Sequence, residues 1–378
     1  MLNEVFMKNP FTLKVVSDKV YFCNRTSEIK DLMRYAQNEA NVVLYSPRRY
    51  GKTSLVHQVQ ARLRANGFLT VFVDLFGLSS VDNIADRIAR GIYAGLLSHK
   101  PLMNRAVDMI KTYKPSLSLS ENSAFNLSVE KSSQRLFGED LLDATLKEVG
   151  AFLKKTGRAV NIVFDEFQEI VELKNPNIEG ILRSHIQSHP VSYVFVGSRR
   201  RVLLEMFNLK RRAFFQSAFD YELGVLPHDE LVPFIGKRFE AGKKKCSATM
   251  AGRIADRVSD HPFYTQKLCY FVYEETAKTA TEKNIEAAFD DLMQNETFYF
   301  EKSLQILAPQ QIAVLKAVSR EPTASILSTS YMQKHNLKSV GGVQGALKRL
   351  QLLDYIDKDQ GKTWYVVDPI FAIWLNQT

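Results

Sequence analysis

The stretch LYSPRRYGKTSL, residues 44–55, decides the fold. Gly51-Lys52-Thr53 leads into an apolar helical pattern, and the apolar run NVVLY (41–45) precedes it as a short buried strand. In a strand–loop–helix of this kind, backbone N–H groups converge on the β-phosphate of a nucleotide. The lysine reaches the β/γ oxygens and the threonine hydroxyl ligates Mg²⁺. This context favours a nucleotide site over the alternative, a basic surface turn.

Ser46 stands where such a loop usually has its first glycine. That glycine eases the exit from the strand, and serine can adopt most of the same dihedral angles. The second glycine, Gly51, lies where the backbone passes closest to phosphate, and it is present. We therefore predict a working loop. The residues predicted to contact the nucleotide are Ser46, Pro47, Arg48, Arg49, Tyr50, Gly51, Lys52, Thr53 and Ser54.

Two acids follow another apolar run, in VNIVFDEFQEI (160–170). A carboxylate at the carboxyl end of a parallel strand faces the crevice where open α/β sheets bind ligands. We expect Asp165 to hold Mg²⁺ through water and Glu166 to polarise the attacking water. The alternative, that the two acids cap the next helix, is disfavoured by the phosphate loop on another strand of the same sheet.

A third apolar run, YVFVGSRRR (193–201), ends in Gly197 and Ser198. A serine after a strand is usually a helix cap. As a third strand end in the same crevice, Ser198 is instead a candidate for sensing the γ-phosphate, and we assign it to the catalytic set.

Strand and helix patterns alternate through the first part of the chain, which predicts a parallel sheet with helices on both faces. A strict period of two over 115–130 predicts an inserted β-hairpin, and the α/β nucleotide-binding domain is expected to cover 1–226. The predicted sheet strands are 41–45, 70–75, 160–164, 193–197 and 219–226.

The pattern changes after Pro227. Residues 227–300 are helical without strand signals and predict an α-helical lid domain. Residues 301–378 give three short helices and a terminal pair of strands around Asp-Gln-Gly, which is typical of a winged helix-turn-helix.

Composition limits the possible partners and location of the protein less than the motifs limit its function. The 378 residues carry a formal net charge of +9, which permits a polyanionic partner without demanding one. Three scattered cysteines give neither a metal spacing nor a disulfide framework, and no apolar run approaches the ~20 residues needed to cross a bilayer. We expect a cytoplasmic protein without a membrane partner.

Distributed motifs resemble the AAA+/STAND-type P-loop ATPases of the "archaeal ATPase" family, which are related to origin-recognition ATPases. The motif SPRRYGKTSL is similar to the family's GPRRVGKTSL, and the remaining matches span nearly the whole chain. They are FCNRTSEIKDL (22–32), VFDEFQ, FVGS, NLKRRAFFQSAFDYELGVL (208–226) and VVDPIFAIWL (366–375). The resemblance implies a P-loop sheet, a helical lid and a C-terminal winged helix, with ATP and Mg²⁺ as ligands.

The same resemblance implies roles for residues outside the loop. Arg25 matches the arginine of the family's entry helix, and Pro262 matches a lid proline that packs near adenine, although Asp260 replaces the glycine of that motif. Arg211 or Arg212 would supply a cation to the γ-phosphate, acting across a boundary in a homo-oligomer. The alternative for this pair is a basic surface cluster.

The winged helix leaves the partner open. On its third helix Gln344 and Lys348 are expected to point outward, and Lys362 lies in the wing, so all three suit duplex DNA. However, 301–378 holds nine Lys/Arg and six Asp/Glu, a net charge of only +3. We therefore predict an Mg-ATP-binding ATPase that uses binding and hydrolysis to drive a conformational change, with DNA as one candidate partner. The alternative is a slow or non-hydrolysing ATP-dependent switch that binds a protein.

Overall fold

The computed structural model describes residues 8–16, 19–23, 25–97, 113–119, 125–131 and 134–377. Contacts divide the chain into two units. The sheet unit comprises Thr26–Arg48 and Lys52–Leu223, and the helical unit comprises Met1–Arg25, Arg49–Gly51 and Gly224–Thr378. Each unit has its own apolar core.

The sheet unit is built on five parallel strands in the order β2-β6-β7-β1-β8. The register places Tyr45 opposite Gly197 and Asp74 opposite Asp165, so the carboxyl ends of four strands meet at one edge of the sheet. The strands are β1 (Val42–Tyr45), β2 (Leu69–Asp74), β6 (Val160–Asp165), β7 (Ser192–Gly197) and β8 (Phe219–Glu222).

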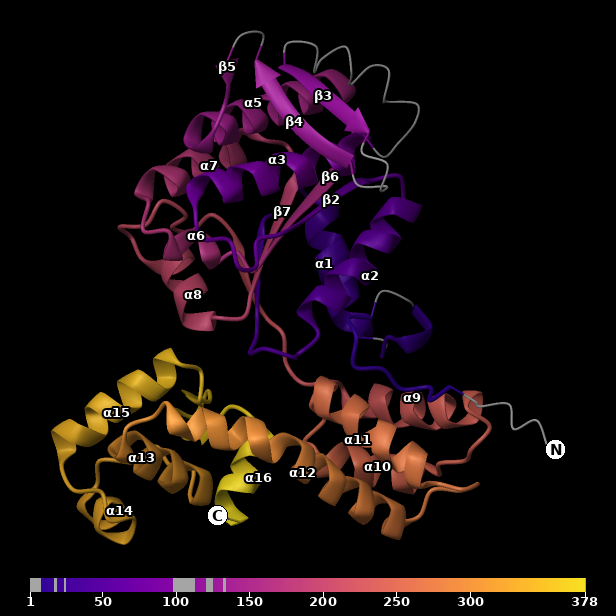
Figure 1. Cartoon of the computed structure of the whole chain (residues 1–378), viewed down its shortest axis with the longest axis vertical. Coiled ribbons are helices and arrows are strands. Elements are labelled where there is room, and N and C mark those ends of the chain that lie inside the picture. Colours follow the sequence, from indigo (N-terminus) through magenta and orange to yellow (C-terminus); the bar gives the residue numbers. More distant parts are fainter. Residues whose placement is uncertain are drawn as a thin grey trace. The chain divides into compact units, whose positions relative to one another are not determined.

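Helices cover both faces of this sheet, with α1 and α2 on one side and α3, α5 and α7 on the other (Figure 1). The central strands β1, β6 and β7 are buried along their whole length, as expected for parallel strands covered on both faces. The helices are α1 (Thr26–Gln37), α2 (Lys52–Ala65), α3 (Val81–Leu97), α5 (Gly138–Thr156), α6 (Glu169–Glu172), α7 (Pro176–Ser188) and α8 (Arg200–Asn208).

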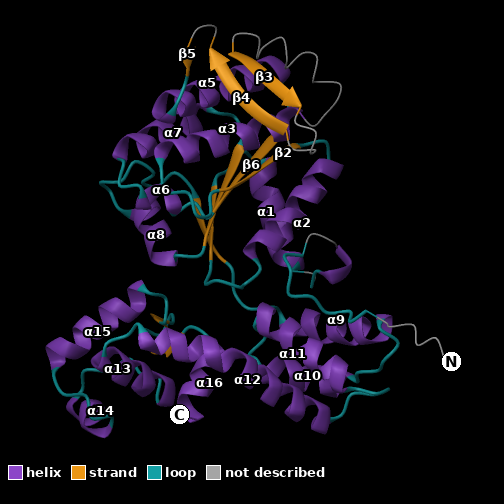
Figure 2. Ribbon diagram, in the orientation of Figure 1, coloured by secondary structure: helices purple, strands orange, loops and turns teal. Residues whose placement is uncertain are grey.

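A separate antiparallel sheet lies between α3 and α5 in the sequence. Its strands β3 (Tyr113–Leu119) and β4 (Phe125–Lys131) pair with Leu117 opposite Leu127, and β5 (Gln134–Arg135) pairs with β4. Figure 2 shows these short strands apart from the five-stranded sheet.

The α-helices of the helical unit pack on one continuous apolar core. Side-chain caps define several helix starts, including a capping box at Thr281 and serine caps at Ser247, Ser328 and Ser339. The elements are η1 (Lys19–Tyr21), α9 (His228–Ala241), α10 (Ala248–Arg257), α11 (Pro262–Glu275), α12 (Glu282–Gln305), α13 (Pro309–Arg320), α14 (Thr329–Lys334), α15 (Val340–Leu352), β9 (Ile356–Lys358), β10 (Trp364–Val366) and α16 (Pro369–Gln377).

The predicted fold class is confirmed: a parallel α/β sheet is followed by helices and by three short helices with an antiparallel strand pair. The fifth strand is shorter than the run 219–226, because β8 ends at Glu222 and the chain then enters the helical unit. The domain borders at 226 and 300 stay predictions. Among the described residues, every helix is too short or too polar to cross a bilayer.

Candidate active site

The loop after β1 is shaped by two residues with positive φ. Arg49 has φ 69° and Gly51 has φ 84°. A Cβ built on Gly51 would meet no atom within 4 Å, so the backbone angle, and not lack of space, is what favours glycine here. The chain then enters α2 directly at Lys52.

Lys52 is buried at the start of α2, with 6% of its surface exposed. Its Nζ donates to the carbonyl oxygens of Ser46 and Pro47, both at 2.9 Å, and to the hydroxyl of Ser46 at 3.2 Å. The loop itself thus satisfies the ammonium group. Two of these acceptors belong to Ser46, and its hydroxyl is an acceptor that the usual glycine would lack, which the sequence comparison did not predict.

Thr53 and Asp165 meet from two different elements, α2 and the end of β6. The Thr53 hydroxyl donates to Asp165 Oδ2 at 2.7 Å. Burial raises the pKa of the Asp165 carboxyl above its usual range, while the hydrogen bond from Thr53 acts in the opposite direction. Asp74, opposite Asp165 in the neighbouring strand, raises that pKa further.

This pair fits a magnesium ion. A buried carboxylate with a raised pKa gains from a nearby cation, and hydroxyl and carboxylate oxygens are the hard ligands that Mg²⁺ prefers. Among the described residues there is no group of three or more His, Cys, Asp or Glu suited to a metal. Mg²⁺ in nucleotide sites usually completes its shell with nucleotide phosphates and water.

Glu166 follows Asp165 in a left-handed backbone conformation, with φ 52°. Its Oε2 accepts a hydrogen bond from the Ser198 hydroxyl at 3.0 Å and another from Gln168 Nε2. Ser198 follows β7 and is 3% exposed. The sequence thus indicated both strand ends, but it assigned no role to Gln168, the last residue of the motif VFDEFQ.

The middle of the loop makes its contacts in the helical unit. Arg25, which is 1% exposed, donates to the carbonyl oxygens of Tyr50 at 3.1 Å and Gly224 at 2.9 Å. The Tyr50 ring lies edge-on to His261, and the Arg49 guanidinium lies 4.3 Å from the ring centroid of Phe263. These contacts hold the loop tip through backbone and ring atoms.

The remaining residues with predicted roles are the lid proline and the pair of arginines. Pro262 begins α11, next to His261. Arg212 donates to Glu179 Oε1 at 2.5 Å, and burial raises the pKa of Glu179 even against this partner, whereas Arg211 is exposed. Of the two arginines, Arg211 is therefore the one available to a neighbouring molecule.

The candidate DNA-contacting residues are all exposed. Gln344 and Lys348 lie on α15, away from its buried face of Val343, Ala346, Leu347 and Leu350, and Lys362 lies between β9 and β10. Their exposure agrees with the expected outward positions, but it does not identify a binding partner.

A family model described as an ATPase domain predominantly from Archaea matches residues 22–211, half of the chain. The chain belongs to this ATPase family. A second model, described as a probable winged helix domain, matches residues 298–377. No curated protein sequence matches the chain.

Solved structures share the fold of this chain at low identity. A Walker-type ATPase of Pyrococcus abyssi is 14% identical, with 97% of this chain and 99% of that chain covered and a TM-score of 0.69. The ORC2 protein of Aeropyrum pernix, solved as ADPNP–ADP complexes, is 15% identical, with 97% and 98% covered and a TM-score of 0.59. The ADP form of the same protein is 14% identical, with 93% of this chain and 95% of that chain covered and a TM-score of 0.53.

Proposed function

We propose that this ATPase-family chain binds Mg-ATP at the edge of the five-stranded sheet and hydrolyses it. One observation carries the proposal: a buried lysine, a bonded Thr–Asp pair and a glutamate held by a serine follow the carboxyl ends of β1, β6 and β7. These strands are neighbours in the sheet, and open α/β sheets bind ligands at this edge.

Each side chain has one task in this mechanism. Lys52 would exchange acceptors in its own loop for β/γ oxygens of ATP. Thr53 and Asp165 would hold Mg²⁺, which neutralises phosphate charge. Glu166 would take a proton from the attacking water, and Ser198 would sense the γ-phosphate. Arg211 would serve a neighbouring subunit, and Pro262 the adenine.

The test is phosphate release by the wild type and by Glu166→Gln. Loss of a general base lowers turnover by roughly 10²- to 10⁴-fold. We expect this drop with ATP affinity unchanged, because the substitution leaves Lys52, Thr53 and Asp165 intact. Glu169→Gln is the matched control, since Glu169 is a nearby acid at the start of α6.

Two results would contradict the proposed mechanism. If Glu166→Gln turned over at the wild-type rate, Glu166 would not be the base. If the wild type released phosphate no faster than Lys52→Ala while still binding ATP, the protein would be a non-hydrolysing switch.

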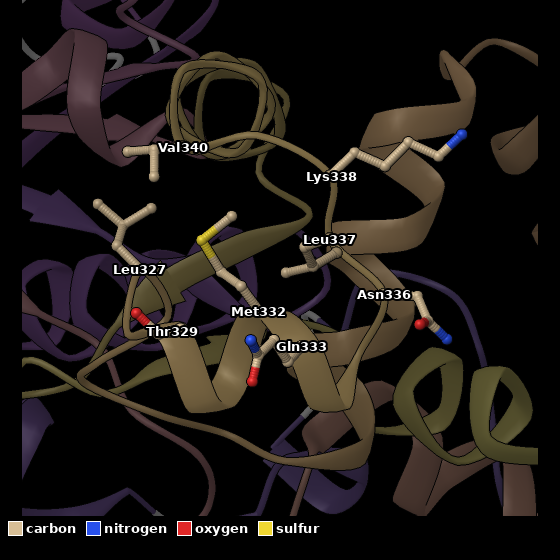
Figure 3. Close-up of a pocket in the computed structure, with 8 residues that line it drawn as sticks. All are labelled: Leu327, Thr329, Met332, Gln333, Asn336, Leu337, Lys338 and Val340. Atoms are coloured by element: carbon tan, nitrogen blue, oxygen red, sulfur yellow. The ribbon is translucent and has the colours of Figure 1, made fainter.

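A second candidate function concerns the winged helix, where a pocket favours a protein partner over DNA. The pocket has a volume of about 580 Å³ and lies between α14 and the start of α15. Figure 3 shows Leu327, Met332, Leu337 and Val340 around it, with Lys338 at its margin. Leu327 and Val340 are 37% and 49% exposed. The other lining residues are Thr329, Gln333 and Asn336, and a hollow of mixed apolar and polar lining suits a partner's side chains better than a phosphate backbone.

A further inference from the structure

Gln168 lies in the turn between β6 and α6 and is almost completely buried, with 1% of its surface exposed. Its Nε2 donates to Glu166 Oε2, the same oxygen that accepts from Ser198. Its Oε1 is also buried, and among the described residues it has no hydrogen-bond partner. Of the two polar atoms of the amide, only Nε2, which faces Glu166, therefore has a hydrogen-bond partner among the described residues.

An unpaired buried acceptor is unfavourable, and native proteins keep few of them. Turning the amide over would not help, because Oε1 would then face a carboxylate oxygen and two acceptors would meet. The orientation of Gln168 is thus set by Glu166. A residue that served only to fill this part of the core would be more stable as an apolar side chain of the same size.

Gly197, at the end of β7, makes room for this amide. A Cβ on Gly197 would lie 2.3 Å from Gln168 Oε1 and 2.2 Å from Leu203 Cδ1. Real Cβ atoms essentially never come so close. Gly197 is not among the residues with positive φ, so the close approach of these two side-chain ends, and not backbone conformation, is what favours glycine here.

Backbone contacts keep the three residues together. The N–H of Phe167 donates to the Val196 carbonyl at 2.8 Å, which fastens the turn after β6 to the end of β7. The N–H of Glu166 donates to Asp165 Oδ1 at 3.0 Å. Glu166 itself is held at φ 52°, a costly conformation for a residue with a side chain.

We infer that Gln168 is a positioning residue for Glu166, and that the lack of a side chain at Gly197 leaves room for the Gln168 amide. The inference rests on the proposed hydrolysis. Two donors on Oε2 fix the carboxylate, and Glu166 Oε1, which has no hydrogen bond to any described residue, is left to accept the proton of water. The residue acts through Glu166 and does not touch the substrate.

The first experiment is a double-mutant cycle between Gln168→Leu and Glu166→Gln. A misplaced catalytic group costs up to about 100-fold in rate. Gln168→Leu should lower kcat by roughly 10- to 100-fold with KM within about 2-fold. In the Glu166→Gln background the same change should cost less than about 2-fold, because the base is already absent. Equal losses in both backgrounds would overturn the inference.

The second experiment uses Gln168→Glu and a pH profile. When protonated, the new acid can donate to Glu166 as Nε2 does, and when ionised it repels Glu166. The kcat of this variant relative to the wild type should therefore fall as the pH rises from about 5.5 to 8.5. A ratio that stays constant with pH would indicate a structural role only. Because Glu is close to Gln in size, this variant keeps the test open if Gln168→Leu does not fold.

Gly197→Ala should reproduce the kcat loss of Gln168→Leu, since the new methyl group displaces the amide. Thermal melting and ATP affinity are measured on every variant to exclude unfolding. If Glu166→Gln keeps full turnover, Glu166 is not the base, and the proposed mechanism fails together with the positioning role. If Glu166→Gln is inactive while Gln168→Leu and Gly197→Ala are not, only the positioning role fails.

Discussion

The candidate site at the sheet edge and the outer face of α15 both carry the polar residues that the sequence predicted, but their environments differ. Lys52, Asp165 and Ser198 are at most 6% exposed, and each hydrogen-bonds to another residue of the site or its loop. Gln344 and Lys348 on α15 are exposed to solvent.

This difference in burial determines how specific a function can be inferred for each region. Burying a polar group costs free energy unless it is paired, so a buried polar cluster must be specified in detail by the surrounding fold. An exposed lysine costs almost nothing and is compatible with any partner or none. The sheet edge therefore supports a chemical mechanism, whereas α15 supports only a surface.

The largest expected effect breaks the site at Lys52. Lys52→Ala removes a charged donor, and hydrogen bonds to charged groups contribute about 1.5–3 kcal/mol each. We expect ATP affinity to fall by at least about 100-fold in calorimetric titration with Mg²⁺. Lys30→Ala, at an exposed position on α1, is the control. Undiminished affinity in Lys52→Ala would remove the nucleotide site.

A smaller effect is expected from the exposed region, if DNA is its partner. Duplex-DNA binding is measured over a salt series with the wild type and with Lys348→Ala/Lys362→Ala. Each lost phosphate contact should lower the slope of log K against log salt by about 0.9, so two contacts should lower it by roughly 2.

The control for that experiment is Lys154→Ala/Lys155→Ala, which removes the same charge from the end of α5. An equal loss in both double variants would indicate a nonspecific charge effect. No binding even at low salt would exclude the DNA role and leave the protein partner, for which the pocket beside Leu327 is the candidate surface.

The sequence predicted most where local pattern and chemistry coincide. The apolar run that becomes β6 places Asp165 and Glu166 at a strand end, and β7 does the same for Ser198. Parallel pairing then brings these ends together, so the positions of these residues at the sheet edge followed from the elements themselves.

What the sequence did not reveal depends on contacts between distant segments. A role for Gln168 followed only from its hydrogen bond to Glu166 and from the space that Gly197 leaves for its amide. Arg212 could be separated from Arg211 only by its ion pair with Glu179 on α7. The contacts that Arg49–Gly51 make within the helical unit are likewise not predictable from local periodicity.

The smallest expected effect is on ATP affinity and concerns the Ser46 hydroxyl in the buried region. This residue is fully buried, and its hydroxyl accepts from Lys52 Nζ at 3.2 Å while donating to the Pro47 carbonyl. ATP must compete with that acceptor for the ammonium group. A neutral hydrogen bond contributes about 0.5–1.5 kcal/mol net, so Ser46→Ala should tighten ATP binding by roughly 3-fold. Alanine is preferred to glycine because glycine would add backbone freedom to the loop.

Two further variants give this small change a clear meaning. Ser27→Ala removes an exposed hydroxyl from α1 and should leave ATP affinity unchanged. In a Lys52→Ala background, Ser46→Ala should also have no effect, because the ammonium group that the hydroxyl restrains is gone. Weaker ATP binding by Ser46→Ala in the wild-type background would mean that the hydroxyl serves the nucleotide directly. The serine would then be a ligand in its own right, and the glycine usual at this position would be the weaker choice for this chain.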